Sequence, residues 1–166
     1  FLPKTATRVF VIGDLHCDWQ NFLSILKIFD DNNIFNDPDA FVVFLGDYID
    51  RGERSLQVLI GVLLLKSLYS NKVILLRGNH ETQNMCFFYG FHEQLQDFDH
   101  NDYQKNNDED DDQENLPEKL SIKIFELANE IFAMMPIYAL TTSGILFVHG
   151  GPYYSETPQS ICSLLN

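Results

Sequence analysis

Short runs of apolar residues alternate along this chain with longer stretches in which apolar residues recur every three or four positions. The short runs have the length and composition of strands, and the longer stretches have the periodicity of helices. The pattern predicts, in order, strand Arg8 to Ile12, helix Asp18 to Phe29, strand Ala40 to Leu45, helix Ser55 to Tyr69 and strand Lys72 to Leu76. The second helix is apolar on more than one side, so we expect it to be well buried.

The second half of the chain is less regular. A helix broken at Gly90 is expected at Thr82 to Leu95, and another at Leu120 to Ile131, which Pro136 ends. Two short apolar runs then predict a hairpin, with strands Ile137 to Leu140 and Ile145 to Val148. The alternation of strands and helices is typical of an α/β sheet with helices packed against it.

The segment from Asp97 to Glu118 lacks periodicity and is rich in Asp, Asn, Glu and Gln. We predict that it is a flexible acidic insertion. It carries much of the net charge of −13, including the unbroken run from Asp108 to Asp112. This charge argues against nonspecific binding to nucleic acid, which requires Lys and Arg.

Composition bounds the remaining possibilities. A chain of 166 residues with 45% hydrophobic residues fits one folded domain. Cys17, Cys86 and Cys162 form no C-x-x-C pair, which favours a reducing compartment, either cytoplasmic or nuclear. The longest apolar run, Val58 to Leu65, is too short to cross a bilayer, so no membrane partner is expected. No signal peptide is visible, and the start at Phe1 suggests an excised piece.

Four polar clusters follow predicted strands. They are Gly13-Asp14-Leu15-His16, Gly46-Asp47-Tyr48-Ile49-Asp50-Arg51-Gly52, Gly78-Asn79-His80-Glu81 and His149-Gly150-Gly151. Functional residues of α/β sheets gather where strands end, so we expect these clusters to meet. Carboxylates mixed with imidazoles suit a pair of divalent metal ions.

The residue types allow a division of labour within this predicted centre. Asp14 and His16 can share one ion, and Asp47 can reach that ion and bridge to a second, for which Asn79 and His149 supply ligands. Two ions roughly 3.5–4 Å apart can hold a hydroxide between them and promote in-line displacement at phosphorus.

Three further residues lie one step outside the predicted ions. Asp50 can fix the tautomer of His80, which could then protonate a departing oxygen. Arg51 can hold two phosphate oxygens with its planar guanidinium group.

In these motifs the chain resembles the phosphoprotein phosphatase family of serine/threonine phosphatases, which includes calcineurin. The family patterns are written GDxHG, GDxVDRG, GNHE and HGG, and the resemblance covers roughly Val9 to Pro152. It implies a metallophosphoesterase β-sandwich flanked by helices, and two divalent ions such as manganese, iron or zinc. It also implies hydrolysis of phosphoserine and phosphothreonine in proteins, with regulatory subunits as further partners.

The resemblance assigns a role to each site residue. It implies Asp14, His16 and Asp47 at the first ion, Asp47, Asn79 and His149 at the second, His80 with Asp50 as general acid, and Arg51 with Asn79 at the substrate phosphate.

The chain also departs from the family pattern. Cys17 stands where the family usually has Gly, beside the expected ions, and Ile49 replaces Val. No His or Arg follows His149, although the family places a further metal ligand and a second phosphate-binding Arg there. We therefore expect residues 1–166 to be the N-terminal portion of one catalytic domain, with its C-terminal strands missing.

Two alternatives remain open. One is a related metallophosphoesterase acting on nucleotides or dinucleoside polyphosphates, against which the Asp50-Arg51 pair and Glu81 favour a protein phosphatase. The other is a noncatalytic fragment or pseudophosphatase that binds partners.

Overall fold

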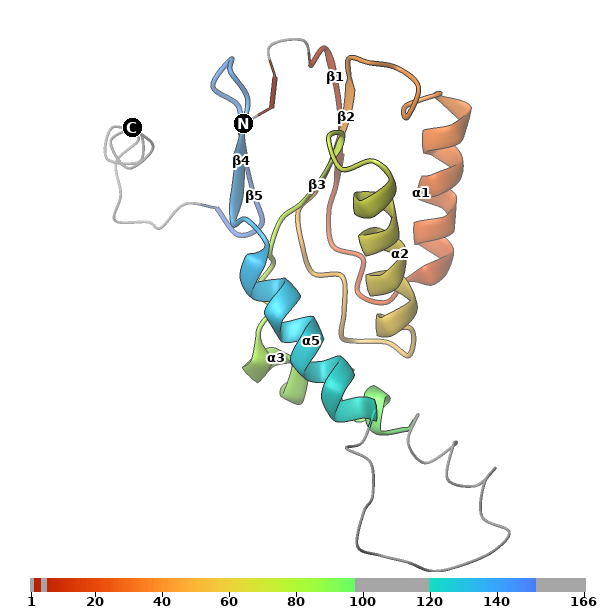
Figure 1. Cartoon of the computed structure of the whole chain (residues 1–166), viewed down its shortest axis with the longest axis vertical. Helices are drawn as coiled ribbons and strands as arrows, with labels where there is room; N and C mark the ends of the chain where they lie inside the picture. Colours follow the sequence, from red (N-terminus) through yellow and green to blue (C-terminus); the bar gives the residue numbers. More distant parts are fainter. Residues whose placement is uncertain (1, 4–5, 98–119, 152–166) are drawn as a thin grey trace, which may run out of the picture.

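A computed structural model describes residues 2–3, 6–97 and 120–151 (Figure 1). The predicted acidic insertion lies almost entirely outside the described residues, so its flexibility stays a prediction. Among the described helices, none combines the length and the apolar character needed to span a membrane.

A parallel three-stranded sheet organises the molecule. Strand β2 (Ala40–Phe44) lies between β1 (Arg8–Ile12) and β3 (Val73–Leu75). Helices α1 (Trp19–Asp31) and α2 (Ser55–Leu68) connect the strands and lie side by side along the sheet (Figure 1). These elements match the predicted strands and helices closely, because the apolar periodicity reports directly on which positions meet the core.

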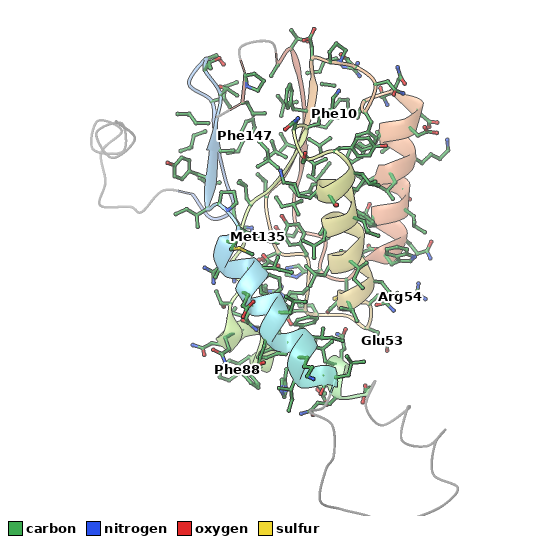
Figure 2. The ribbon with its side chains drawn as sticks, viewed as in Figure 1. Phe10, Glu53, Arg54, Phe88, Met135 and Phe147 are labelled. Carbon is green, nitrogen blue, oxygen red and sulfur yellow. The ribbon has the colours of Figure 1, made fainter. Side chains whose placement is uncertain are left out.

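Both faces of the sheet are covered, so every residue of β2 is buried. Val42 and Phe44 contribute to the core beneath the helices, to which Phe10 also belongs. Phe41 and Val43 contribute to a second core that includes Phe147 of the hairpin; Figure 2 labels Phe10 and Phe147 in the two cores.

The hairpin that forms this second core is antiparallel. It consists of β4 (Tyr138–Leu140) and β5 (Leu146–Val148), as predicted. Leu2 is buried beside it, where its N–H donates to the Leu140 oxygen at 3.0 Å and its strand bridge pairs it with Thr141. Two sheets with helices outside them confirm the expected fold class.

Two shorter features complete the architecture. Helix α3 (Gln83–Phe88) and the helical residues 91–97 are separated at Gly90, where φ is +106° and the predicted break therefore occurs. Helix α5 (Leu120–Met134) ends before Pro136, as expected. It buries Ser121, Phe125, Ala128 and Phe132, which lie one position after the apolar row seen in the sequence.

The expectation that the whole of α2 is well buried is wrong. Val58, Leu59, Val62 and Leu65 are in the core, but Ile60, Leu64 and Leu68 are 47%, 56% and 72% exposed. The helix packs against the sheet and against α1, so the side that faces neither of them has no surface to pack against. The sequence therefore predicted more burial of α2 than the structure has, because exposed apolar residues are common on protein surfaces.

A substitution at Gly61 tests the packing of α1 against α2. A Cβ atom at Gly61 would lie 2.5 Å from Cε1 of Phe22, a buried ring of α1. We expect Gly61→Ala to lower the free energy of unfolding by about 1–2 kcal/mol, because overpacking outweighs the gain in helix propensity. Urea denaturation measures the change, and Gln57→Ala on the exposed side of the same helix is the control. A more stable Gly61→Ala protein would contradict the close contact.

Candidate metal centre

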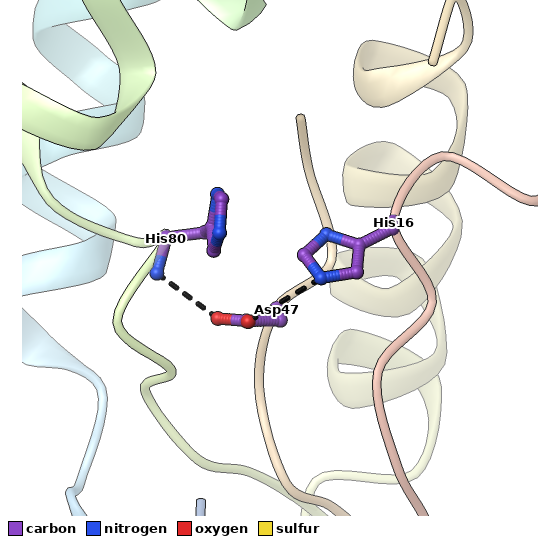
Figure 3. Close-up of side chains that lie close together, drawn as sticks. All are labelled: His16, Asp47 and His80. Carbon is purple, nitrogen blue, oxygen red and sulfur yellow. Dashed lines mark hydrogen bonds and ion pairs between the residues drawn. The ribbon is translucent and has the colours of Figure 1, made fainter. Parts of the chain in front are cut away.

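The four polar clusters converge beyond the carboxyl ends of β1, β2, β3 and β5. Figure 3 shows His16, Asp47 and His80, which come from three different loops and surround one small space. The parallel strands β1, β2 and β3 present their carboxyl ends at one edge of the sheet, which brings the first three clusters together, and the hairpin brings the fourth from the second sheet.

Asp47 lies at the middle of the cluster. Its Oδ2 atom is 3.5 Å from Nε2 of His16 and 3.3 Å from Nε2 of His149. Its Oδ1 atom accepts the backbone N–H of His80 at 2.9 Å. Two groups of possible ligands have donor atoms within 4.8 Å of one another, namely Asp14, Asp47 and His149, and His16, Asp47 and His80. Both ring nitrogens of His80 are hydrogen-bonded, to Asp50 and to Arg51, so His80 is not counted as a ligand. Asp47 belongs to both groups, which is the position that a bridging carboxylate requires.

The donor set fits divalent ions such as manganese, iron or zinc. Among the described residues, Nδ1 of His149 has no hydrogen-bond partner, although this atom is buried 3.7 Å from Oδ1 of Asp14. Nε2 of His149 lies 2.8 Å from Oδ1 of Asn79. Leaving a buried nitrogen without a hydrogen-bond partner costs free energy. A bound metal ion would supply the missing partner.

All five predicted ligands therefore lie together. Their division between two ions stays a prediction, since His149 lies near Asp14 as well as near Asp47 and Asn79.

A buried, hydrogen-bonded pair of His80 and Asp50 lies directly beside the ligands. Nδ1 of His80 donates to Oδ2 of Asp50 at 2.8 Å, and both side chains are fully buried. The other carboxylate oxygen of Asp50 accepts the N–H of Phe91 at 3.0 Å. Burial raises the pKa of Asp50, while the hydrogen bonds from His80 and Phe91 act in the opposite direction. Asp50 thus fixes the ring of His80 with Nε2 directed away from it.

Arg51 contacts the second ring nitrogen of His80, Nε2. One Nη atom of the guanidinium group donates to Nε2 of His80 at 3.2 Å, and the group lies over the ring of Tyr89 at 5.5 Å. The Arg51 side chain is otherwise exposed, so it can turn toward solvent without disturbing the core. Arg51, His80 and Asp50 thus lie together beside the ligands, and their roles stay predictions.

Backbone strain is concentrated in the loops of this centre. His16, Asp47, Asp50 and Arg51 have φ values of 39°, 55°, 68° and 67°, in the left-handed region that costs a non-glycine residue energy. Backbone hydrogen bonds hold the first two loops together, since the oxygen of Asp47 accepts the N–H groups of Leu15 and His16 at 3.0 Å each.

Glu81 is the structural residue that sequence reasoning missed. Its buried carboxylate accepts the N–H of Asp47 at 2.7 Å, of Tyr48 at 2.8 Å and of Gly78 at 2.8 Å. Burial raises the pKa of Glu81, and these three hydrogen bonds favour its charged form. Its presence in a motif of metal-binding residues was the available signal, but the sequence could not show that it binds backbone rather than metal.

Two glycines allow the loop after β2 and the loop after β3 to touch. A Cβ atom at Gly46 would lie 2.3 Å from the nitrogen of Gly78, and one at Gly78 would lie 2.2 Å from Oδ1 of Asp47. No side chain fits at either position, so these glycines permit the approach that Glu81 then fixes.

The sequence predicted the Cys17 side chain beside the ions, but its thiol points into the protein interior instead. Its thiol donates to the oxygen of Asp50 at 3.0 Å and lies 2.8 Å from the hydroxyl oxygen of Ser55, within the protein interior. Burial raises the pKa of this thiol, which makes it a poor nucleophile. Its backbone has a φ of 65°, so Cys17 adopts the turn conformation that would suit the family's glycine.

Comparison with known proteins agrees with this geometry. The calcineurin-like phosphoesterase family matches residues 7–164, and the chain belongs to this family. The family implies divalent metal ions.

Similar proteins include named protein phosphatases. Human serine/threonine-protein phosphatase 5 is 30% identical over 153 residues, which cover 92% of this chain and 26% of that protein. A Caenorhabditis elegans protein named as serine/threonine-protein phosphatase C27B7.6 is 34% identical over 150 residues, covering 90% of this chain and 27% of that protein. The chain thus spans roughly a quarter of the length of these curated relatives.

Solved structures show the same fold. A Saccharomyces cerevisiae serine/threonine phosphatase with similarity to human PP5 has a TM-score of 0.67 and 28% identity, over 95% of this chain and 42% of that one. A structure named as a diadenosine tetraphosphatase has a TM-score of 0.52 at 17% identity, over 95% of this chain and 56% of that one, which shows the fold alone.

Replacement of Glu81 tests its position beneath the two loops. Gln keeps one acceptor oxygen but places an NH₂ group against at least one of the three backbone donors. We expect Glu81→Gln to lower the free energy of unfolding by about 1–3 kcal/mol and to weaken manganese binding about 10–100-fold. Chemical denaturation and calorimetric metal titration measure both effects. Glu93→Gln, at an exposed position, is the control. Equal stability and metal affinity of the two variants would contradict the role of Glu81 in holding the two loops together.

Proposed function

We propose that this chain carries the metal-binding part of a phosphatase that hydrolyses phosphoserine and phosphothreonine in proteins. The observation that supports it most strongly is the contact of Arg51 with His80, which is paired with Asp50 beside the ligand groups. In this proposal Arg51 would bind the phosphate, His80 would donate the proton and the ligand groups would hold the ions, all beside one space.

Asp14, His16, Asp47, Asn79 and His149 would hold the ions in this proposal. When bound, divalent ions would polarise the phosphoryl oxygens and make a nearby water more acidic. Buried Asp47 is fixed by hydrogen bonds, whereas Asp14 and Asn79 are exposed and can adjust to ligands.

The remaining residues would bind the substrate and move a proton. In the described conformation Arg51 donates to Nε2 of His80, so this nitrogen carries a lone pair rather than a proton. A phosphate group would draw Arg51 away as the guanidinium binds two of its oxygens. Nε2 would then take up a proton from solvent, with the ring held by Asp50 on the opposite side, and deliver it to the departing serine or threonine oxygen.

Phosphoproteins are the substrates that we propose, in keeping with the protein phosphatases that the chain resembles. Regulatory subunits are proposed as additional partners on the same basis. Dinucleoside polyphosphates remain the alternative substrate class, for which the tetraphosphatase structure supplies a shared fold and no further argument.

A substrate panel tests the proposal directly. The chain, supplied with manganese, is assayed by phosphate release with phosphoserine and phosphothreonine peptides and with dinucleoside tetraphosphate, and Asp47→Asn serves as the inactive control. We expect at most weak release, and from the peptides alone, because no His or Arg follows His149 to complete the family's set. Asp47→Asn should lose this activity and its metal binding, because both ligand groups contain Asp47. Preference for the dinucleotide would favour the alternative class. Absence of turnover despite bound metal would favour a noncatalytic protein.

His80 is tested by varying the leaving group. We expect His80→Asn to slow hydrolysis of a phosphoserine peptide about 10²–10⁴-fold, because serine leaves poorly without a proton. Hydrolysis of an aryl phosphate with an acidic phenol should fall much less, and manganese stoichiometry should not change. His92→Asn, outside the site, is the matched control. Equal losses on both substrates would argue against proton donation by His80.

A further inference from the structure

The backbone of Asp50 is held by two buried side chains that the proposed reaction does not use. Its N–H donates to Oγ of Ser55 at 3.1 Å, and its carbonyl oxygen accepts the Cys17 thiol at 3.0 Å. Sγ of Cys17 also lies 2.8 Å from Oγ of Ser55. Cys17 belongs to the loop after β1, and Ser55 is the first residue of α2. Two distant segments thus meet on one residue of the loop after β2.

These three contacts form a closed ring in which each donor has one acceptor. The thiol has a single proton and the Asp50 oxygen can only accept, so the thiol donates to that oxygen. The Ser55 hydroxyl accepts the N–H of Asp50 and therefore directs its own proton to Sγ of Cys17. Sulfur is a weak donor and a weak acceptor, but consecutive hydrogen bonds in a buried network strengthen one another. Side chains thus satisfy both backbone polar groups of Asp50.

The backbone on either side of the Arg51 side chain is held as well. The N–H of Arg51 donates to the oxygen of Tyr89 at 3.1 Å. Nε2 of Gln94 donates to the oxygen of Gly52, and Oε1 of Gln94 accepts the N–H of Ser55 at 3.2 Å. The guanidinium group is exposed, so the loop is fixed at its backbone while the Arg51 side chain stays accessible to a ligand.

The left-handed conformation of this loop requires such support. Asp50 and Arg51 have φ values of 68° and 67°, which cost energy in residues with a side chain and persist only where the surroundings enforce them. The peptide unit between the two residues carries the Asp50 oxygen and the Arg51 N–H. Its plane is therefore fixed by Cys17 at one end and by Tyr89 at the other. This plane sets the direction in which the Arg51 side chain leaves the loop.

We propose that Cys17 and Ser55 are positioning residues, which hold the peptide unit between Asp50 and Arg51 so that Arg51 reaches the substrate phosphate. The inference rests on the proposed function, in which Arg51 binds that phosphate. The glycine that the family usually has at position 17 offers no side chain for this contact. The thiol is thus a feature of this chain, and the left-handed φ of 65° at Cys17 is its energetic cost.

Amide hydrogen exchange of the full chain, measured by NMR without metal, tests the hold on the loop. Cys17→Ala removes the donor and keeps a residue with a Cβ atom at this position. The Asp50 and Arg51 amides should then exchange about 3–10-fold faster relative to the amides of β2. Cys17→Ser should restore slow exchange, because contacts of 2.8 and 3.0 Å suit a hydroxyl. Gly61→Ala, which should lose stability away from this loop, is the matched control and should leave the ratio unchanged.

Calorimetric titration with inorganic phosphate in the presence of manganese tests the effect on Arg51. Cys17→Ala and Cys17→Gly should each weaken phosphate binding about 3–10-fold. Cys17→Gly should nevertheless be the more stable of the two, since glycine adopts the left-handed conformation freely. A purely structural thiol would make phosphate affinity follow stability instead. In an Arg51→Ala background, which itself should weaken phosphate binding, Cys17→Ala should have no further effect.

The outcomes separate this proposal from the function on which it rests. Unchanged exchange in Cys17→Ala, or no recovery in Cys17→Ser, would overturn the proposal. A loss of manganese affinity in Cys17→Ala that matches its loss of phosphate affinity would overturn it as well, because the thiol would then act on the metal ligands. Wild-type phosphate affinity in Arg51→Ala would instead contradict the proposed function, and the exchange ratios would still decide whether Cys17 holds the loop.

Discussion

One buried carboxylate holds the loops of the metal centre in register. Glu81 accepts backbone N–H groups from the loop after β2 and from the loop after β3, and these groups have no other partner in the loops themselves. Removal of a charged group from water is costly, but three charge-assisted hydrogen bonds offset much of that cost. The position of Asp47 relative to His80 follows from this connection, since one residue belongs to each loop.

The centre consequently divides into a fixed part and an adjustable part. Asp47, Asp50 and His80 are buried, and their side chains are hydrogen-bonded to groups of neighbouring loops. Asp14 and Arg51 are exposed at the rim. Chemistry that requires accurate placement can rely on the inner residues, whereas the outer residues can follow an arriving ligand. Asp50 and Arg51 are adjacent and both have left-handed backbone, and the Asp50 side chain is buried whereas the Arg51 side chain is exposed.

Much of this arrangement follows from the sequence, and the rest depends on tertiary packing. Apolar periodicity predicts the strands and helices because each buried position repeats with the geometry of its element. Three of the clusters meet because parallel strands end at one edge of the sheet, and the hairpin adds His149 from the second sheet. Periodicity could not show that α5 buries Phe125 and Phe132, since Leu120 and Leu127 are as apolar and repeat at the same spacing. The direction of the Cys17 thiol likewise depends on Ser55, which is distant in sequence.

The contact between Leu2 and the hairpin has a consequence for the order of folding. Leu2 bonds to Leu140 and bridges to Thr141, so this pairing joins segments that are far apart along the chain. Such long-range contacts carry a large loop-closure entropy and form late, whereas the helices between them can form locally. The same hairpin delivers His149 to ligands that begin at Asp14. We therefore expect the complete ligand set to exist only after this last topological step, so that metal uptake reports the completion of folding and does not nucleate it.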